Sequence, residues 1–505
     1  MNPVLLPLLV AIPLMLAAVT LLWRTIPAQR TVLFLSPALS LAAGVWLLVT
    51  HVQNPAISHA VGSFLPGIAI VFVSDSLTAL LMVVTAAITI VASSFLVATR
   101  EDRFRFVVPM VVMVGAGVNG ILLTGDLFNL FVFVEVMLMP SYALIAVTGT
   151  WRRLGIGRMF IIVNIVASTI LVMGVGFVYG VTGTVNLAML RGIGAENPQA
   201  ALAISVVLLA LLVKGGVVPA HGWLVRGYPG TSAGVMGLFS AIHTKMGLYA
   251  VYRIYATVFD GAAPYGPVLL AIVVLTVVLG ALGTFGERRM RGVLAFQMVT
   301  GVGQILIGLV VFTQFSIAAG LFYMVHHMIT MGGLIMAAGA IEDAYGSGRF
   351  DRLSGLMKRE RVIAALMALG LLSLVGLPPT SGLWGKVMLL SSAADGPEWR
   401  TWLLLGSVAL ASIASLLALQ HFWREIFWGP PIREFLPDDP VTHRGRRTRI
   451  TDDTRIPRRL IAPPLIMISS SVVMFLLVGI VWPLFQRAAT ALMNLDPYVE
   501  AVMNG

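Results

Sequence analysis

Long apolar runs recur along the whole chain and restrict what it can fold into. A run of about 20 apolar residues is long enough to cross the hydrocarbon core of a bilayer as a helix. Hydrophobic residues make up 58% of the 505 residues and charged residues only 11%, whereas a soluble domain carries about 25% charged residues. The sequence therefore predicts an all-α integral membrane protein.

About fourteen apolar windows can be placed along the chain, and each is predicted to be one transmembrane helix. The first window lacks a basic segment before it and a small-residue cleavage site, so we expect a span rather than a cleavable signal peptide. The windows lie near residues 3–23, 31–51, 75–98, 106–124, 127–148, 156–180, 201–221, 231–252, 265–286, 293–313, 315–341, 362–391, 401–423 and 461–485.

Basic residues follow alternate loops between these windows. The odd-numbered loops hold 26 of the 33 Lys and Arg residues, and the even-numbered loops with the C-terminal tail hold only Arg191, Arg253, Arg400 and Arg487. The positive-inside rule then places the odd loops in the cytoplasm and both termini outside. The basic segment 429–460 is expected to be a cytoplasmic loop near anionic lipid, and not a nucleic-acid site.

The windows also suggest an internal repeat. Windows 9–13 begin 159 to 170 residues after windows 4–8, and five spans is an odd number, so the second unit must be inverted relative to the first. Windows 7 and 12 are interrupted, by VKGGVVPAHGWL and GLPPTSGLWGKVMLL. The predicted parts are spans 1–3 (1–105), the first repeat (106–260), the second repeat (261–428), the basic loop (429–460), and span 14 with the tail (461–505).

Three of the four lysines lie inside apolar windows: Lys214, Lys245 and Lys386. One acid, Glu135, does so too. A charged side chain at mid-bilayer costs about 2.5–3.5 kcal/mol on insertion scales, and such groups usually line an ion path or pair with one another. Lysine can lose its proton when it is buried, whereas arginine cannot. Lys214 is the candidate partner of Glu135, and the alternative is a static tie between two helices.

The other two membrane lysines and the histidines in the apolar windows each have two interpretations. Lys245 has no nearby acid and could exchange protons, or it could extend to the interface. Lys386 follows the break in window 12 and could be an anchor lysine. The histidines are proton-relay candidates or hydrogen-bonded core residues, and His221 is expected on roughly the same helix face as Lys214. They are His221, His243, His326 and His327.

Several chemistries are excluded by the sequence. The chain has no cysteine, so it forms no disulfide and no thiolate metal site. HExxH, GxSxG and Walker-type motifs are absent, and no acid cluster accompanies the histidines, so we expect no metal and no cofactor. Asp75 and Asp126 stand at window edges and are expected to be helix N-caps. A membrane enzyme is therefore the weaker class.

Four segments together resemble a known family, the antiporter-like subunits shared by respiratory complex I and Mrp-type multisubunit cation/proton antiporters. They are GDLFNLFVFVEVMLMPSYALIAVTG, VKGGVVPAHGWLVRGYP, HTKMGLYAVYRIY and GLPPTSGLWGKVMLL. The resemblance implies a proton path through Glu135, Lys214, Lys245 and Lys386. It also implies partner Mrp-type subunits, a bacterial cell membrane, and transport of protons and Na⁺.

Within this family the chain is most similar to the D subunits of Mrp antiporters. Gly301 and Met331 stand where some relatives carry histidine and lysine, so His326, His327 and water would have to connect Lys245 with Lys386. No cluster of oxygen ligands for Na⁺ appears in the windows. Two alternatives stay open: a proton-pumping subunit of complex I or a membrane-bound hydrogenase, and a structural scaffold with vestigial charges.

Overall fold

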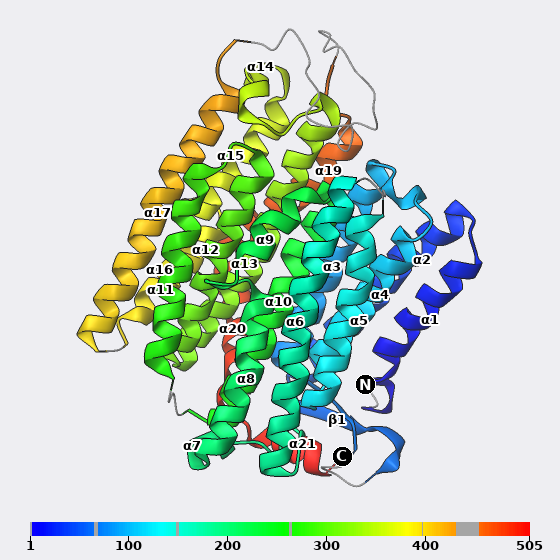
Figure 1. Ribbon diagram of the computed structural model, residues 1–505, viewed down its shortest axis with the longest axis vertical. Coiled ribbons are helices and arrows are strands. Elements are labelled where there is room, and N and C mark those ends of the chain that lie inside the picture. The colour runs from blue at the N-terminus through cyan, green and yellow to red at the C-terminus, as the bar shows by residue number, and fades with distance from the viewer. Residues whose placement is uncertain are drawn as a thin grey trace.

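The computed structural model describes residues 3–64, 69–147, 151–261, 265–395, 397–430 and 454–504. Long helices stand side by side in one bundle, and both termini lie at the same end of it (Figure 1). In the described residues, eleven helices are long and apolar enough to cross a membrane, by length and composition. The predicted all-helical membrane protein is therefore confirmed.

The bundle is built from helices of very different length. The helices are α1 (Leu8–Leu22), α2 (Ile26–Thr50), α3 (Ser76–Ala98), α4 (Val107–Leu123), α5 (Leu127–Ala146), α6 (Trp151–Thr182), α7 (Ile193–Glu196), α8 (Pro198–Gly215), α9 (Gly222–Gly227), α10 (Ala233–Phe259), α11 (Gly266–Gly283), α12 (Met290–Val311), α13 (Gln314–Tyr345), α14 (Leu356–Arg359), α15 (Arg361–Val375), α16 (Ser381–Ala393), α17 (Glu398–Phe427), α19 (Arg458–Leu476), α20 (Val478–Met493) and α21 (Asp496–Asn504).

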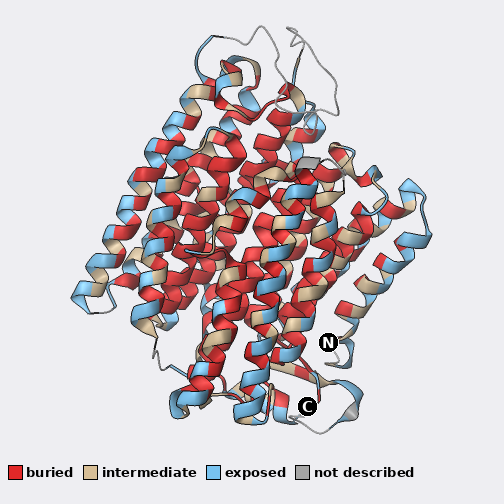
Figure 2. Cartoon of the chain, viewed as in Figure 1, coloured by how far each residue is buried: buried red, intermediate tan, exposed pale blue. Residues whose placement is uncertain are grey.

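Three helices form the centre of the bundle. The most apolar stretches of α12 and α13 are 94% buried, whereas that of α1 is 28% buried, and α10 packs against both α13 and α12. Buried residues therefore fill the middle, and exposed apolar residues cover the outer helices (Figure 2). Apolar side chains on the outside suit a helix that faces lipid.

Two aspartates begin long helices, as their positions predicted. Asp75 accepts a hydrogen bond from the backbone N–H of Thr78 at 2.9 Å at the start of α3. Asp126 does the same for Asn129 at 2.8 Å at the start of α5. Each side chain satisfies one of the N–H groups that a helix start leaves without a partner.

The interruptions expected in windows 7 and 12 are both present, and they have the same geometry. After α8, Gly216 takes a left-handed conformation with φ 81°, and the next N–H bonds to the carbonyl of Leu212. After α15, Gly376 has φ 93°, and the next N–H bonds to the carbonyl of Leu372. Both ends match the Schellman pattern, in which glycine is favoured because it has no Cβ.

Some features differ from the expectations. A two-stranded antiparallel sheet, β1 (Ala56–Ala60) and β2 (Val71–Asp75), joins α2 to α3, although no strand was expected. The last window is two helices, α19 and α20, which meet at Leu477. Most of the basic loop, residues 431–453, lies outside the described residues.

Candidate functional site

A serine lies between the predicted glutamate–lysine pair. The Nζ atom of Lys214 on α8 is 4.0 Å from Oε1 of Glu135 on α5. The same amine donates a hydrogen bond of 2.7 Å to Oγ of Ser168 on α6, and this hydroxyl donates to Oε1 of Glu135. The two charged side chains are 6% and 17% exposed. Ser168 therefore bridges the acid and the amine.

Ser168 was not predicted from the sequence. Its one signal is a pair of hydroxyl residues, Ser168 and Thr169, in the middle of an otherwise apolar window. Thr169 bonds only to the carbonyl of Ile165 in its own helix. Only the packing of α5, α6 and α8 shows which of the two hydroxyls faces the charged pair.

The break after α8 holds Lys214 in place. Lys214 lies in the last turn of α8, where backbone carbonyls lose their helical partners. The indole of Trp223 on α9 donates to the carbonyl of Val213 at 3.0 Å, and Oγ1 of Thr276 accepts from the N–H of Val218 at 3.1 Å. Side chains thus satisfy the interrupted backbone inside the bundle, as the absence of bulk water requires.

The histidine next to this pair is His243 on α10. Its Nε2 lies 2.8 Å from Oγ of Ser141, its ring stacks on Phe239 at 4.0 Å, and the charge of Lys214 acts on it. Lys214 and His243 both line one small cavity. The two groups are therefore neighbours without a direct hydrogen bond.

His221 does not lie where the sequence predicted. The helix of Lys214 ends at Gly215, and His221 precedes the first residue of the separate short helix α9. It is half-buried near Phe296. The expectation of a shared helix face is wrong, because the break redirects the chain between the two residues.

Lys245 is enclosed on every side. Its side chain is fully buried in the middle of α10, and Nζ donates to the carbonyl oxygen of Ser240 at 2.7 Å. No described carboxylate lies within ion-pair distance of it. An unpaired ammonium in such a place carries a large desolvation cost, so the amine is suited to carry a proton only transiently.

The ring of His327 on α13 occupies the space beside Gly301 on α12. A Cβ atom built on Gly301 would lie 2.0 Å from Nε2 of this ring, so the glycine makes room for the histidine. Neither ring nitrogen makes a regular hydrogen bond with the described protein atoms, and the charge of Lys245 acts on the ring. His327 and Lys245 are therefore close enough to interact electrostatically.

His326, the next residue toward the N-terminus, belongs to a closed group of hydroxyls. Its Nδ1 lies 2.8 Å from Ser381 and 3.3 Å from Thr330. Ser381 contacts Ser471 at 2.8 Å, Ser471 contacts Ser373 at 3.4 Å, and Ser373 contacts Thr330 at 3.3 Å. These four hydroxyls, the hydroxyl ring, come from α13, α15, α16 and α19, and none of them was predicted from the sequence.

Lys386 completes the line on α16. Its Nζ donates to the carbonyl oxygen of Val375, the last residue of α15, at 2.8 Å, and to Oγ of Ser412 on α17 at 2.8 Å. The charge of Lys386 acts on His326. The amine thus binds a carbonyl that the helix break has freed, as expected for an interrupted helix in a membrane.

Several buried polar atoms along this line have no hydrogen-bond partner among the residues that the structure describes. They include Nδ1 of His243, Oγ1 of Thr244, Nε2 of Gln304 and Nε2 of His326. Buried polar groups usually have partners, and ordered water commonly supplies them. No group of three His, Asp, Glu or Cys side chains suited to a metal ion was found in the described ranges.

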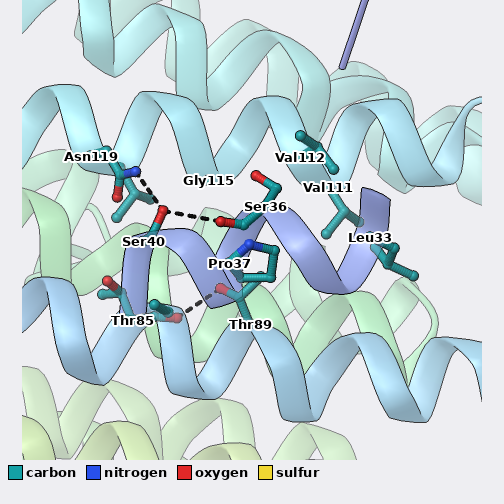
Figure 3. A pocket seen from close by; sticks show the side chains of 12 residues that line it. Leu33, Ser36, Pro37, Ser40, Thr85, Thr89, Val111, Val112, Gly115 and Asn119 are labelled. Atoms are coloured by element: carbon teal, nitrogen blue, oxygen red, sulfur yellow. Dashed lines mark hydrogen bonds between the residues drawn. The ribbon is translucent and has the colours of Figure 1, made fainter. Parts of the chain in front are cut away.

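A separate cavity is lined by residues of α2, α3 and α4 (Figure 3) and by none of the charged residues described above. Its polar side chains are hydroxyls and an amide: Asn119 donates to Ser40 at 2.8 Å, and Thr89 donates to the carbonyl of Thr85 at 2.7 Å. None of the residues that line it titrates, so the cavity does not extend the line.

The fold and the site define a multi-span membrane subunit with a line of buried titratable side chains. The chain belongs to the family described as "NADH:quinone oxidoreductase/Mrp antiporter, TM", whose family model matches residues 124–413. The matched region contains Glu135, Lys214, Lys245 and Lys386.

Relatives match over nearly the whole chain. It is 32% identical to the D subunit of the Na(+)/H(+) antiporter of Bacillus subtilis (strain 168), covering 99% of both chains. It is 30% identical to the N subunit of the NADH-quinone oxidoreductase of Desulforudis audaxviator, covering 91% of this chain and 93% of the relative. A chain in the structure of the Mrp complex from Dietzia sp. DQ12-45-1b matches with a TM-score of 0.92, at 38% identity and full coverage of both chains.

Proposed function

We propose that this protein is the proton-translocating subunit of an Mrp-type Na⁺/H⁺ antiporter complex in a bacterial cell membrane. The observation that carries the proposal is the buried line from Glu135 through Ser168 to Lys214, and onward through Lys245 to Lys386. Relatives with "antiporter" in their names match over most of their length. The partners are other membrane subunits of such a complex and the bilayer, and no cofactor is needed.

The proposed architecture has fourteen spans. Three pairs of helices each count as one broken span: α8–α9, α15–α16 and α19–α20. The other eleven spans are the single helices α1–α6, α10–α13 and α17. The left-handed glycines at positions 216 and 376 support two inverted repeats, because the same helix end recurs in both units. Both termini are proposed to be external, opposite to the basic loops.

The first proposed step is the opening of the Glu135–Lys214 pair. Two unit charges 4 Å apart interact by about 4 kcal/mol at the effective dielectric constant near a protein surface, and the interaction falls with distance. When Lys214 moves from Glu135 toward Lys245, the repulsion between the two amines favours loss of the proton from Lys245. Ser168 lets Lys214 leave gradually, because the amine already binds its hydroxyl.

The second proposed step carries the proton from Lys245 to Lys386. His327 interacts electrostatically with Lys245, His326 is its neighbour in the chain, and His326 interacts electrostatically with Lys386. A neutral imidazole can accept a proton at one nitrogen and release one at the other. The polar atoms without protein partners along this route are places where water would complete the relay.

A second candidate function is proton pumping in a redox-driven complex of the respiratory complex I type. The 30% identity to a subunit of NADH-quinone oxidoreductase favours it. Genes for quinone- or iron–sulfur-binding subunits beside this gene would support it, whereas genes for small antiporter subunits would support the first candidate.

The function is tested with Glu135→Ala in the assembled complex. Without the carboxylate of Glu135, the charge of Lys214 is buried and uncompensated, so the amine must become neutral. A neutral amine cannot alternate between the acid and Lys245. We expect loss of Na⁺/H⁺ exchange in vesicles, measured with a pH-sensitive dye, at an unchanged amount of assembled complex. Met139→Ala, at an exposed position one turn further along α5, is the matched control. Normal exchange by the Glu135 variant would refute the proposal.

A further inference from the structure

Another buried ion pair involves α10, about two helical turns beyond Lys245. Asp75, the N-cap of α3, contacts Arg253 of α10 at 2.6 Å, and the two side chains are 2% and 3% exposed. The sequence pattern placed Arg253 in a loop, but α10 continues to Phe259 and encloses it. A buried pair is a weak source of stability, so the pair calls for another role.

The aspartate of this pair lines a cavity at the end of the bundle that holds the termini. The cavity is about 280 Å³, and one water takes up about 30 Å³, so it has room for several waters. Asp75 lines the cavity and contacts Arg253, so it connects the two. The polar residues around the cavity are His51, Asp75, Ser76, Arg487, Thr490, Asn494 and Tyr498.

A line of side chains on α10 runs inward from this pair. Lys245, Tyr249 and Arg253 are four residues apart and share one helix face, which spans about 12 Å at 1.5 Å per residue. The guanidinium of Arg253 lies 5.8 Å from the ring centroid of Tyr249. The hydroxyl of Tyr249 donates to the carbonyl of Leu122 at 2.9 Å and lies 3.4 Å from Oγ1 of Thr78.

In this conformation the route from the cavity to Lys245 is closed. The amine of Lys245 binds the carbonyl of Ser240, five residues toward the start of α10, and so points away from Tyr249 and the cavity. The guanidinium of Arg253 contacts the carboxylate of Asp75 at 2.6 Å, and a cation this close favours the ionised form of a carboxyl group. A carboxylate that stays paired in this way does not take up a proton to pass inward, so Arg253 closes the route.

We propose that this cavity is a proton access port on the face of the termini, and that Asp75 and Arg253 form its inner gate to Lys245. The guanidinium already lies 5.2 Å from the ring of Tyr498, which offers it a second position away from the carboxylate. With Arg253 moved, the carboxylate takes a proton from hydronium in the cavity, leaving water. It then passes that proton through Tyr249 and water to the amine of Lys245.

This proposal rests on the proposed function, and two sets of variants test it. Asp75→Asn keeps the helix cap, since asparagine caps as well as aspartate, but cannot carry the charge. We expect exchange to fall about 100-fold, the lower end of what a positioned proton-transfer group contributes, with normal assembly. Arg253→Lys keeps the ion pair and should retain more exchange than Arg253→Gln.

Cysteine chemistry tests the port itself, because the chain has no cysteine. Ala491→Cys lines the cavity, and Gln53→Cys is exposed nearby without lining it. A membrane-impermeant, positively charged methanethiosulfonate, added from the face that labels Gln53→Cys, should abolish exchange by Ala491→Cys. The Gln53→Cys complex should exchange equally well before and after the reagent.

The outcomes separate the two proposals. Full exchange by Asp75→Asn, or by the modified Ala491→Cys complex, together with loss of exchange in Glu135→Ala, would overturn the port and leave the proposed function standing. Normal exchange by Glu135→Ala would overturn the function on which the port depends. If Asp75→Asn fails to assemble, the Arg253 and Ala491 variants decide.

Discussion

The amine of Lys214 lies 2.7 Å from the hydroxyl of Ser168, whereas the carboxylate of Glu135 lies 4.0 Å away from it. The nearest side-chain partner of the lysine is therefore a neutral hydroxyl, and the ion pair is held through it. An amine that already binds the bridge can leave the acid without losing every partner at once. This arrangement suits a pair that opens and closes better than it suits a static tie.

The first prediction concerns this bridge. Ser168→Ala should lower Na⁺/H⁺ exchange by about tenfold, since removing one buried hydrogen bond to a charged group costs about 1.5–3 kcal/mol. Ser168→Thr keeps the hydroxyl and should retain most of the exchange. Exchange in vesicles, compared at equal amounts of complex, measures both. Equal activity of the alanine and threonine variants would show that the hydroxyl plays no part in transport.

The second prediction concerns the two central lysines. Lys245→Arg and Lys386→Arg should lose exchange nearly as fully as the corresponding alanine variants, because arginine keeps its charge but does not release its proton. Exchange in vesicles at equal amounts of complex measures the four variants. Near-normal exchange by Lys245→Arg would mean that the proton does not pass through that amine. The relay proposed here would then have to be abandoned.

The third prediction concerns the glycine beneath His327. Gly301→Val should force the ring out of its place, because even a Cβ would lie 2.0 Å from it, and overpacking of this kind costs about 1–3 kcal/mol. We expect a lower melting temperature of the purified complex and a loss of exchange. Gly176→Val, on α6 where a Cβ would meet no atom within 4 Å, is the control for backbone effects of losing a glycine. Equal melting temperatures in the two variants would contradict the packing seen here.

The fourth prediction concerns orientation. β1 lies at the end of the bundle that holds the termini and α14 at the opposite end (Figure 1). Gln53 is an exposed residue just before β1, and Met357 on α14 is 47% exposed. A cysteine at position 53 should react with an impermeant thiol reagent added to intact cells, and one at position 357 should react only after the membrane is opened. The reverse pattern would place the termini in the cytoplasm.

Much of the fold could be predicted because it depends on local properties of the chain. A run of apolar residues is a span wherever it occurs. Glycine and proline mark the two breaks in the sequence, although the residue that ends α15 is Gly376 and not the prolines that follow it. The N-caps at Asp75 and Asp126 are equally local. The three membrane lysines and Glu135 stood out as candidates because any charge inside an apolar window is costly.

The partners of those residues depended on tertiary structure. The roles of Ser168, the hydroxyl ring and Gly301 depend on the helices that pack against them. No pattern among neighbouring residues shows which face of a helix another helix will contact. Arg253 looked like a loop residue because its partner, Asp75, is distant in the chain and compensates its charge only in the folded bundle. The sequence by itself determined the apolar helices, the breaks after α8 and α15, and the four buried charges Glu135, Lys214, Lys245 and Lys386. Only the packing of α5, α6, α8, α10, α12 and α13 decided which side chains those charges meet, because contacts between helices join residues that are far apart in the chain.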